Sequence, residues 1–250
     1  LWRPQRVHRR GSTPQRQMNY FAHGHAYLDD GYFLAGTAVP DWLSVVDRRM
    51  RVRSRRVRPF AGESDRRVAA LAGGILQHHH DDLRFHQTRA FAELSLHLTT
   101  LVRDVLGGDG GFRPSFLGHI LVEILLDAAL IAEDPTQLDA YYDALVRIDR
   151  GLVADAVNRM ATRQSERLGE FIEKFCAVRF LYDYLQDEKL LWRLNHVMQR
   201  VGLPCLPSEF LAILPRARRD VQRLRDELLD VGLSSLRLGT ESLPNRNPLG

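Results

Sequence analysis

The sequence predicts an all-α protein that folds as a single helical-bundle domain. From about Asp65 onward, apolar residues recur three and four positions apart and few stretches alternate as strands do, which is typical of helices that bury one face. Clusters of glycine and proline interrupt this pattern where helices are expected to end. The 250 residues, 44% hydrophobic and 26% charged, are typical of a globular protein with a sizeable core.

Six helices are expected after residue 63. They span about 64–106, 114–133, 136–160, 165–185, 190–201 and 208–231. The first contains HHHDDLRFH at 78–86 and ends at the glycine-rich stretch 107–111, a strong stop signal. The second is almost continuously apolar, FLGHILVEILLDAALIA, which predicts a central and buried helix. Before these helices, residues 18–42 are expected to form a short helix and a loop that lie against the core.

The helical domain is expected to cover residues 18–238. Residues 1–17 contain five arginines, no acidic residue and no apolar periodicity, so they are expected to be a disordered basic leader, with Met18 as the natural start. Residues 239–250 are polar and are expected to be a flexible tail. The net charge of +4 depends on the leader, and the rest of the chain is slightly acidic.

Several classes of protein have no support in the sequence. Two cysteines, Cys176 and Cys205, are too few for a disulfide framework, which favours a reducing, cytoplasmic location. No stretch of eighteen uncharged apolar residues occurs, so no membrane-spanning helix is expected. The sequence also lacks a P-loop, a dinucleotide fingerprint and a serine nucleophile elbow, which argues against nucleotide-binding proteins and serine hydrolases.

One strongly basic segment lies inside the expected domain. Between Arg48 and Arg58, seven of eleven residues are arginine. Such a segment attracts phosphates, nucleic acid or an acidic protein partner. It has no interleaved aromatic residues for base stacking, which makes nucleic acid the less favoured partner. A solvated surface is the alternative interpretation, because arginine outnumbers lysine 33 to 2 throughout the chain.

Two of the expected helices each carry a stripe of histidine and carboxylate residues at four-residue spacing. The stripes are His78, Asp82 and His86 in the first helix and His119, Glu123 and Asp127 in the second. Residues four apart lie about 40° apart around a helix, so each stripe lies on one face. The second stripe has apolar neighbours, and its burial is costly unless the charges pair with each other, with cations or with a metal. Such stripes are typical of metal sites in helical bundles. An interhelical network of ion pairs and hydrogen bonds is the alternative.

The N-terminal stretch adds three candidate ligands. His23 and His25 are two residues apart, and Asp41 follows Pro40 at an expected turn that would aim its carboxylate into a cavity. Histidine and carboxylate ligands without a thiolate suit manganese, iron, zinc or magnesium. Magnesium sites are usually completed by substrate phosphates, which favours phosphoester chemistry.

Four stretches of the sequence carry a family resemblance. They are MNYFAHGH at 18–25, GTAVPDW at 36–42, GILQHHHDDLRFH at 74–86 and VEILLD at 122–127. Together they resemble the acyl carrier protein phosphodiesterase family, which is similar to the all-helical HD-type metal-dependent phosphohydrolases. The resemblance covers roughly residues 18–130. Thr37 stands where the family has asparagine, Glu123 where it has aspartate, and His86 where it has a further aspartate.

The resemblance implies an HD-phosphohydrolase-like bundle that hydrolyses a phosphodiester and releases 4′-phosphopantetheine from holo acyl carrier protein. It implies a divalent metal, manganese, magnesium, iron or zinc, that polarises a phosphoryl oxygen and lowers the pKa of a bound water. The expected metal ligands are His23, Asp41, His78, Asp82 and Asp127. The expected catalytic residues, as proton carriers or supports of the ligands, are His25, His86, His119 and Glu123. The arginines of segment 48–58 would dock the acidic carrier protein.

The departures from the family leave two further hypotheses open. The chain is expected to be this phosphodiesterase or a relative with an altered substrate, because one hard ligand replaces another at several positions. A non-catalytic helical interaction protein that keeps the fold, with the stripes as core networks, is the alternative. Metal retained through dialysis would separate the two.

Overall fold

The computed structural model describes residues 19–108 and 111–233, with side chains as far as residue 229. The leader expected at 1–17 and the tail expected at 239–250 therefore lie outside the described residues. Within the described part, every regular element is an α-helix or a 3-10 helix, which confirms the all-α class. The finer assignment to an HD-phosphohydrolase-like bundle stays a prediction.

The elements follow one another along the chain without strands between them in the described ranges. They are α1 (Tyr20–Gly24), η1 (His25–Tyr27), α2 (Gly31–Val46), α3 (Ser54–Val57), η2 (Arg58–Gly62), α4 (Arg66–Phe85), α5 (Arg89–Val105), α6 (Pro114–Glu133), α7 (Pro135–Val146), α8 (Arg150–Met160), α9 (Leu168–Val178), η3 (Phe180–Leu185), α10 (Asp187–Val201), η4 (Ser208–Ile213), α11 (Leu214–Arg223) and α12 (Arg225–Leu233).

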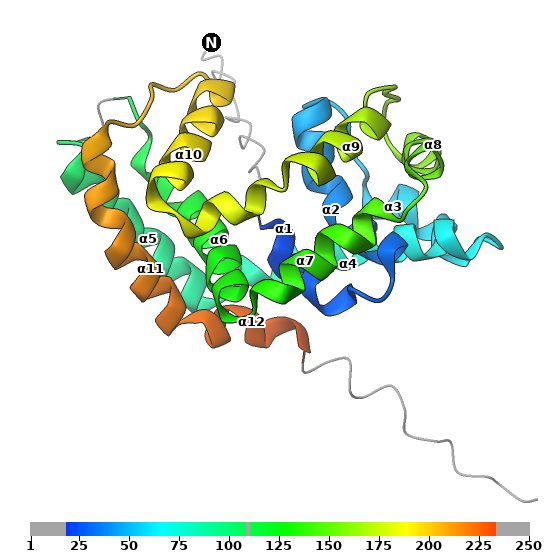
Figure 1. Ribbon diagram of the computed structural model, residues 1–250, viewed down its shortest axis with the longest axis horizontal. Helices are drawn as coiled ribbons and strands as arrows, with labels where there is room; N and C mark the ends of the chain where they lie inside the picture. Colours follow the sequence, from blue (N-terminus) through cyan, green and yellow to red (C-terminus); the bar gives the residue numbers. More distant parts are fainter. Residues whose placement is uncertain (1–18, 109–110, 234–250) are drawn as a thin grey trace, which may run out of the picture.

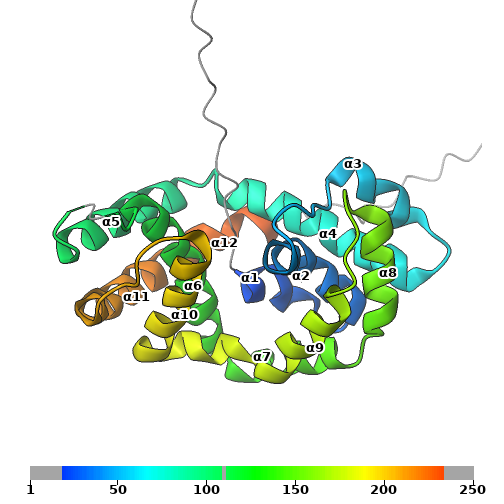
Figure 2. The ribbon, with the colours of Figure 1, turned by 90° about the horizontal axis from the view of Figure 1, so that it is seen from above.

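The helices gather at two ends of an elongated molecule. Helices α5, α6, α10 and α11 lie at one end, and α2, α3, α8 and α9 lie at the other (Figures 1 and 2). The short helix α1 lies between the two groups, in contact with α2 and α6. The histidine-rich helix α4 packs along α2. The region around α1 is therefore where polar residues from both groups can meet.

Helix α6 has the bounds and the central position that the sequence predicts. Most of its side chains are buried, and it packs against α5, α11 and η3. By length and composition alone α6 could cross a membrane, because an 18-residue window has a mean hydropathy of 1.9. However, 78% of that window is buried inside the protein. Core helices meet the same criterion, so the apolarity of α6 is explained by its place in the core.

Four of the expected helices are shorter than predicted because local hydrogen bonds and backbone turns divide them. The first is broken between Phe85 and Arg89, where the Thr88 hydroxyl accepts the backbone N–H of Phe91 and starts α5. Asp149 caps α8 in the same way and divides the helix expected at 136–160. Arg179, with φ of 48°, ends α9 before η3. The helix expected at 208–231 is divided into η4, α11 and α12.

The prediction of a loop before residue 42 is wrong. Helix α2 covers Gly31–Val46 and continues through Pro40, with Asp30 as its N-cap. Its buried face packs on α4 at two glycines. A Cβ atom on Gly36 would lie 2.3 Å from the backbone oxygen of Leu71, and one on Gly74 would lie 2.0 Å from the backbone oxygen of Phe33. The two backbones are thus in direct contact, and this contact places α2 beside the histidines of α4.

Candidate metal centre

Seven buried polar residues come from the elements around α1. They are Asn19, His23, Thr37, Asp41, His78, Glu123 and Asp127. They lie at or just before α1 and on α2, α4 and α6; α1 contacts both α2 and α6, and α2 packs along α4. Burying a charge costs several kcal/mol unless it is paired and hydrogen-bonded. The partners of these side chains therefore indicate what the region can bind.

Three of the predicted catalytic residues form a compact group. The Nε2 atom of His86, the Nε2 atom of His119 and the Oε1 atom of Glu123 lie 3.1 Å from one another in all three pairs. Within the described part of the chain, the ligand atoms of these three residues lie close enough together to hold a metal ion. The rings of His86 and His119 are stacked, with centroids 4.8 Å apart. We call these three residues the triad.

The spacing within the triad fits a metal ion. With metal–nitrogen and metal–oxygen bonds of about 2.0–2.1 Å, neighbouring ligand atoms of a tetrahedral or octahedral ion lie roughly 2.8–3.4 Å apart. The observed 3.1 Å falls in this range. Without a shared cation or proton, the lone pairs of the two nitrogens and the carboxylate would repel one another. The triad can therefore hold either a metal or a proton.

Asp82 holds the ring of His86 in place. The Nδ1 atom of His86 lies 2.8 Å from the backbone oxygen of Asp82 and 2.8 Å from its Oδ1 atom. The backbone oxygen takes the hydrogen bond, and Oδ1 makes a charge contact without one. Burial lowers the pKa of His86, but the neighbouring carboxylates of Asp82 and Glu123 outweigh this effect and raise the pKa to about 10. A carboxylate behind a histidine is the arrangement that orients metal ligands in proteins.

Glu123 is fully buried and keeps its charge through the two histidines. Burial favours its neutral form, but the hydrogen bonds from His119 and His86 outweigh burial and lower the pKa of Glu123 below its usual value. The triad thus contains a buried carboxylate that stays ionised, as metal coordination requires.

His78 and His23 form a second pair beside Thr37. The Nδ1 atom of His78 donates to the backbone oxygen of Thr37 at 2.7 Å, and its ring centroid lies 4.2 Å from that of His23. The pKa of His78 lies well below its usual value because burial, together with the neighbouring histidines, disfavours the charged ring. The Nδ1 atom of His23 lies 3.9 Å from Oδ2 of Asp81, whereas its Nε2 atom is buried without a hydrogen-bond partner in the described chain.

Asp127 fixes the start of α1. Its carboxylate accepts the backbone N–H groups of Phe21 at 3.1 Å and Ala22 at 2.7 Å. Burial raises the pKa of Asp127 to about 8, although these two hydrogen bonds oppose the change. This contact links α6 to the helix that carries His23.

Asp41 lies inside α2 and not at the turn expected after Pro40. Its side chain is 2% exposed, and Oδ2 has no hydrogen-bond partner among the described residues. Burial raises the pKa of Asp41 well above its usual value, and the charges of Glu123, Asp82 and Asp127 add to the effect. Within the described residues, buried atoms of Asn19, His23 and Asp82 also lack hydrogen-bond partners. Native proteins leave few such atoms unsatisfied, so this region fits an additional ion or polar group.

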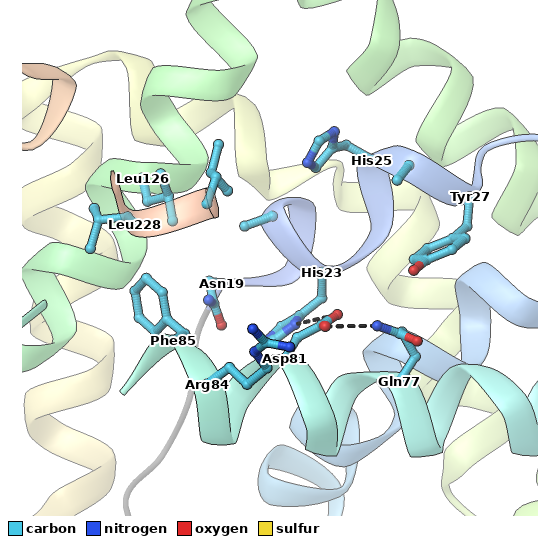
Figure 3. Close-up of a pocket in the computed structure, with 13 residues that line it drawn as sticks. Asn19, His23, His25, Tyr27, Gln77, Asp81, Arg84, Phe85, Leu126 and Leu228 are labelled. Atoms are coloured by element: carbon cyan, nitrogen blue, oxygen red, sulfur yellow. Dashed lines mark hydrogen bonds and ion pairs between the residues drawn. The ribbon is translucent and has the colours of Figure 1, made fainter. Parts of the chain in front are cut away.

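A cavity of about 80 Å³ opens next to these residues (Figure 3). His23, His25 and Asp81 line its polar part, and Leu126 and Leu228 line its apolar part. The cavity can hold several water molecules or a small polar group. Burial lowers the pKa of His25, which favours its neutral form.

The structure brings members of the two predicted stripes together at the triad. His86, His119 and Glu123, expected to be proton carriers or supports, supply the converging ligand atoms. Among the expected ligands, Asp82 contacts His86, and His23, Asp41, His78, Asp82 and Asp127 form no comparable group in the described chain. Their assignment as ligands stays a prediction.

The sequence-based set also missed two residues that line the cavity. Arg84 is half-buried, and its side chain has no hydrogen-bond or ion-pair partner in the described part. Asn19 is buried at the start of α1. Arg84 lies within HHHDDLRFH, three residues after Asp81, so its helical spacing is a signal that could have placed it beside the site.

The fold and the site are inferred from this chain only, without a relative to compare. No protein-family model, no curated protein and no solved structure matches the chain, so the family resemblance stays a prediction.

Proposed function

We propose that this protein is a metal-dependent phosphoester hydrolase whose metal is held by His86, His119 and Glu123. The observation that carries the proposal is the convergence of two imidazole nitrogens and one carboxylate oxygen at 3.1 Å. Two histidines and one carboxylate suit manganese, iron or zinc, and leave positions open for water and substrate.

Neighbouring residues support hydrolysis of a phosphoester. A divalent metal, when bound, supplies a Lewis acid for a phosphoryl oxygen and a water of lowered pKa. Arg84 has no anionic partner in the described chain and lines the adjacent cavity, where its guanidinium can bind a phosphate in two-point geometry. His23 and His25 line the same cavity and can accept or donate a proton. Asp82 orients His86.

The proposed substrate class is a phosphodiester carried by an acidic protein, as the family resemblance implies. The arginines between Arg48 and Arg58 support it, because none of them forms an ion pair within the described residues. Met50, Val52 and Val57 are buried and fix this segment, while most of its arginines are exposed. Such a surface favours encounter with an acidic carrier protein.

One observation favours the alternative, a non-catalytic helical interaction protein. The pKa of His86 is raised to about 10, so a proton shared among His86, His119 and Glu123 can hold the triad together without a metal. In that case the buried stripes form a structural network.

Hydrolysis of bis(4-nitrophenyl) phosphate by the full chain with added Mn²⁺ tests the proposal. Glu123→Gln keeps the shape of the side chain and removes the anionic ligand, so it should lower the rate on the order of 100-fold. Glu93→Gln, which changes an exposed carboxylate paired with Arg89, is the matched control and should leave the rate unchanged. Equal rates in Glu123→Gln and the native chain would rule out the triad, and metal binding without hydrolysis of any phosphoester would favour the interaction protein.

A further inference from the structure

A second cavity, of about 610 Å³, lies beside α9, η3 and α10. Tyr20 of α1 and Val45 of α2 also line it. In Figure 2, α9 and α10 stand at the two ends of the segment that contains η3. None of its lining residues belongs to the triad or to the cavity beside it. Its volume lies in the range of about 300–1,000 Å³ that is usual for small-molecule sites.

The walls of this cavity are apolar. They include Val45, Phe171, Phe175, Val178, Phe180 and Val197. Val178 is 58% exposed and Val45 is 37% exposed, and Trp192, which is 52% exposed, follows on α10. Exposed apolar side chains are common singly, but here two of them border one cavity. The arrangement is typical of a site that covers an apolar ligand.

The charges at the cavity are all positive. Lys174, Arg193 and Arg200 line it, and no aspartate or glutamate of the described chain does. Lys174 and Arg193 have acidic partners, Glu170 and Asp183.

Arg200 is the cation left for a ligand. It is half-buried and forms no ion pair within the described ranges. The guanidinium of Arg48 donates to its backbone oxygen, so a second arginine lies next to Arg200. A half-buried cation without an anion is unfavourable next to apolar walls, so the cavity fits a ligand that carries a negative group.

Tyr184 lines the cavity and is fully buried, with its hydroxyl inaccessible to a ligand, so it adds an aromatic wall and no polar contact. The cavity therefore combines apolar walls with a cation that has no ion-pair partner in the described chain.

We infer that this cavity binds a single-chain fatty carboxylate, with its tail against the phenylalanines and valines and its carboxylate on Arg200. The tail matches the apolar walls, and the carboxylate matches a rim that has cations and no acidic lining residue. A neutral apolar ligand would leave Arg200 without an anion. A bilayer surface fits a protruding apolar patch, whereas these residues line an open hollow.

Titration calorimetry of the 250-residue chain with dodecanoate, below its micelle concentration, tests the inference. We expect saturable binding of one dodecanoate per chain. Dodecyltrimethylammonium has the same tail with a positive head group, and butyrate has the same head group with a short tail. Both should bind at least tenfold more weakly.

Two pairs of variants locate the binding site. Arg200→Gln should weaken dodecanoate binding about tenfold, the effect of losing roughly 1.4 kcal/mol. Arg147→Gln, an exposed arginine without an ion-pair partner in the described chain and outside this cavity, should have no effect. Val178→Glu places an acid at the mouth and should abolish binding. Leu83→Glu is its control, because Leu83 is 59% exposed on α4.

Three outcomes would overturn the inference. If dodecyltrimethylammonium binds as tightly as dodecanoate, the cavity recognises the apolar tail only and not the carboxylate. Binding that is equal in Val178→Glu and Leu83→Glu would place the ligand elsewhere. Sedimentation with anionic phospholipid vesicles, without binding of monomeric dodecanoate, would make this face a membrane contact.

Discussion

At the scale of single residues, the candidate centre depends on where each imidazole ring carries its proton. The Nδ1 atoms of His86 and His78 face the backbone oxygens of Asp82 and Thr37, at 2.8 Å and 2.7 Å. A carbonyl oxygen can only accept a hydrogen bond, so both rings are protonated on Nδ1. Each Nε2 atom is then able to act as a ligand in the neutral ring. In His86 the Nε2 atom is one of the three converging atoms of the triad.

The pKa of His86 predicts that metal binding releases a proton. The pKa is raised from 6.5 to about 10, so His86 is protonated at neutral pH in the metal-free protein, and a metal must displace that proton. The affinity for Mn²⁺ should therefore rise with pH between pH 6 and 8, by up to about tenfold per unit for this one proton. Calorimetry in buffers of different ionisation enthalpy counts the protons released.

Asp82→Asn is the test of this cause. It keeps all three atoms of the triad but removes a charge that raises the pKa of His86, so fewer protons should be released at neutral pH. Proton release that is the same in the native chain and in Asp82→Asn would contradict the account of His86.

At the scale of elements, the crossing of α2 and α4 determines where the histidines of α4 lie. The backbones touch at Gly36 and Gly74, because neither position has room for a Cβ atom. His78 follows Gly74 by one helical turn and bonds to Thr37, which follows Gly36 directly. The geometry around His78 is thus a consequence of the helix contact.

A larger side chain at this crossing should disturb both stability and the centre. Gly74→Ala forces a Cβ atom to within 2.0 Å of the Phe33 backbone oxygen and should lower the free energy of unfolding by about 3 kcal/mol, measured in urea. Gly62→Ala is the control, because no atom lies within 4 Å of the added Cβ. Metal affinity should fall in Gly74→Ala only. Equal stability of the two variants would show that the helices can separate without cost.

The sequence predicts the elements better than their ends. The period of apolar residues identifies α6 with its observed bounds, because every turn of that helix faces the core. The same period continues across 86–88 and 147–149, where Thr88 and Asp149 each start a new helix. The apolar period does not reveal such capping bonds, because each of them involves a single polar side chain. At Pro40 the error is the opposite one: the sequence predicts a turn after this proline, but α2 continues through it.

At the scale of the whole molecule, the candidate site joins helices that are far apart in sequence. His86 is at the end of α4, and His119 and Glu123 are on α6, so the triad forms only when the end of α4 lies against α6. Helical spacing placed His86 on one stripe and His119 and Glu123 on the other, which could be read from sequence. Which members of the two stripes converge depends on how the two helices are placed relative to each other. The spacing of residues along one helix gives no information about that placement. The roles of ligands and supports therefore could not be assigned from sequence.

The central claim is that the triad binds a metal, and metal content tests it most directly. We would dialyse the full chain after loading with Mn²⁺, Fe²⁺ or Zn²⁺ and count bound metal by mass spectrometry. The native chain should retain about one equivalent, and His119→Asn should retain none. His97→Asn is the matched control and should behave like the native chain, because His97 bonds to Asp220 outside the triad. A native chain that stays empty, or a His119→Asn variant that retains as much metal as the native chain, would contradict the account.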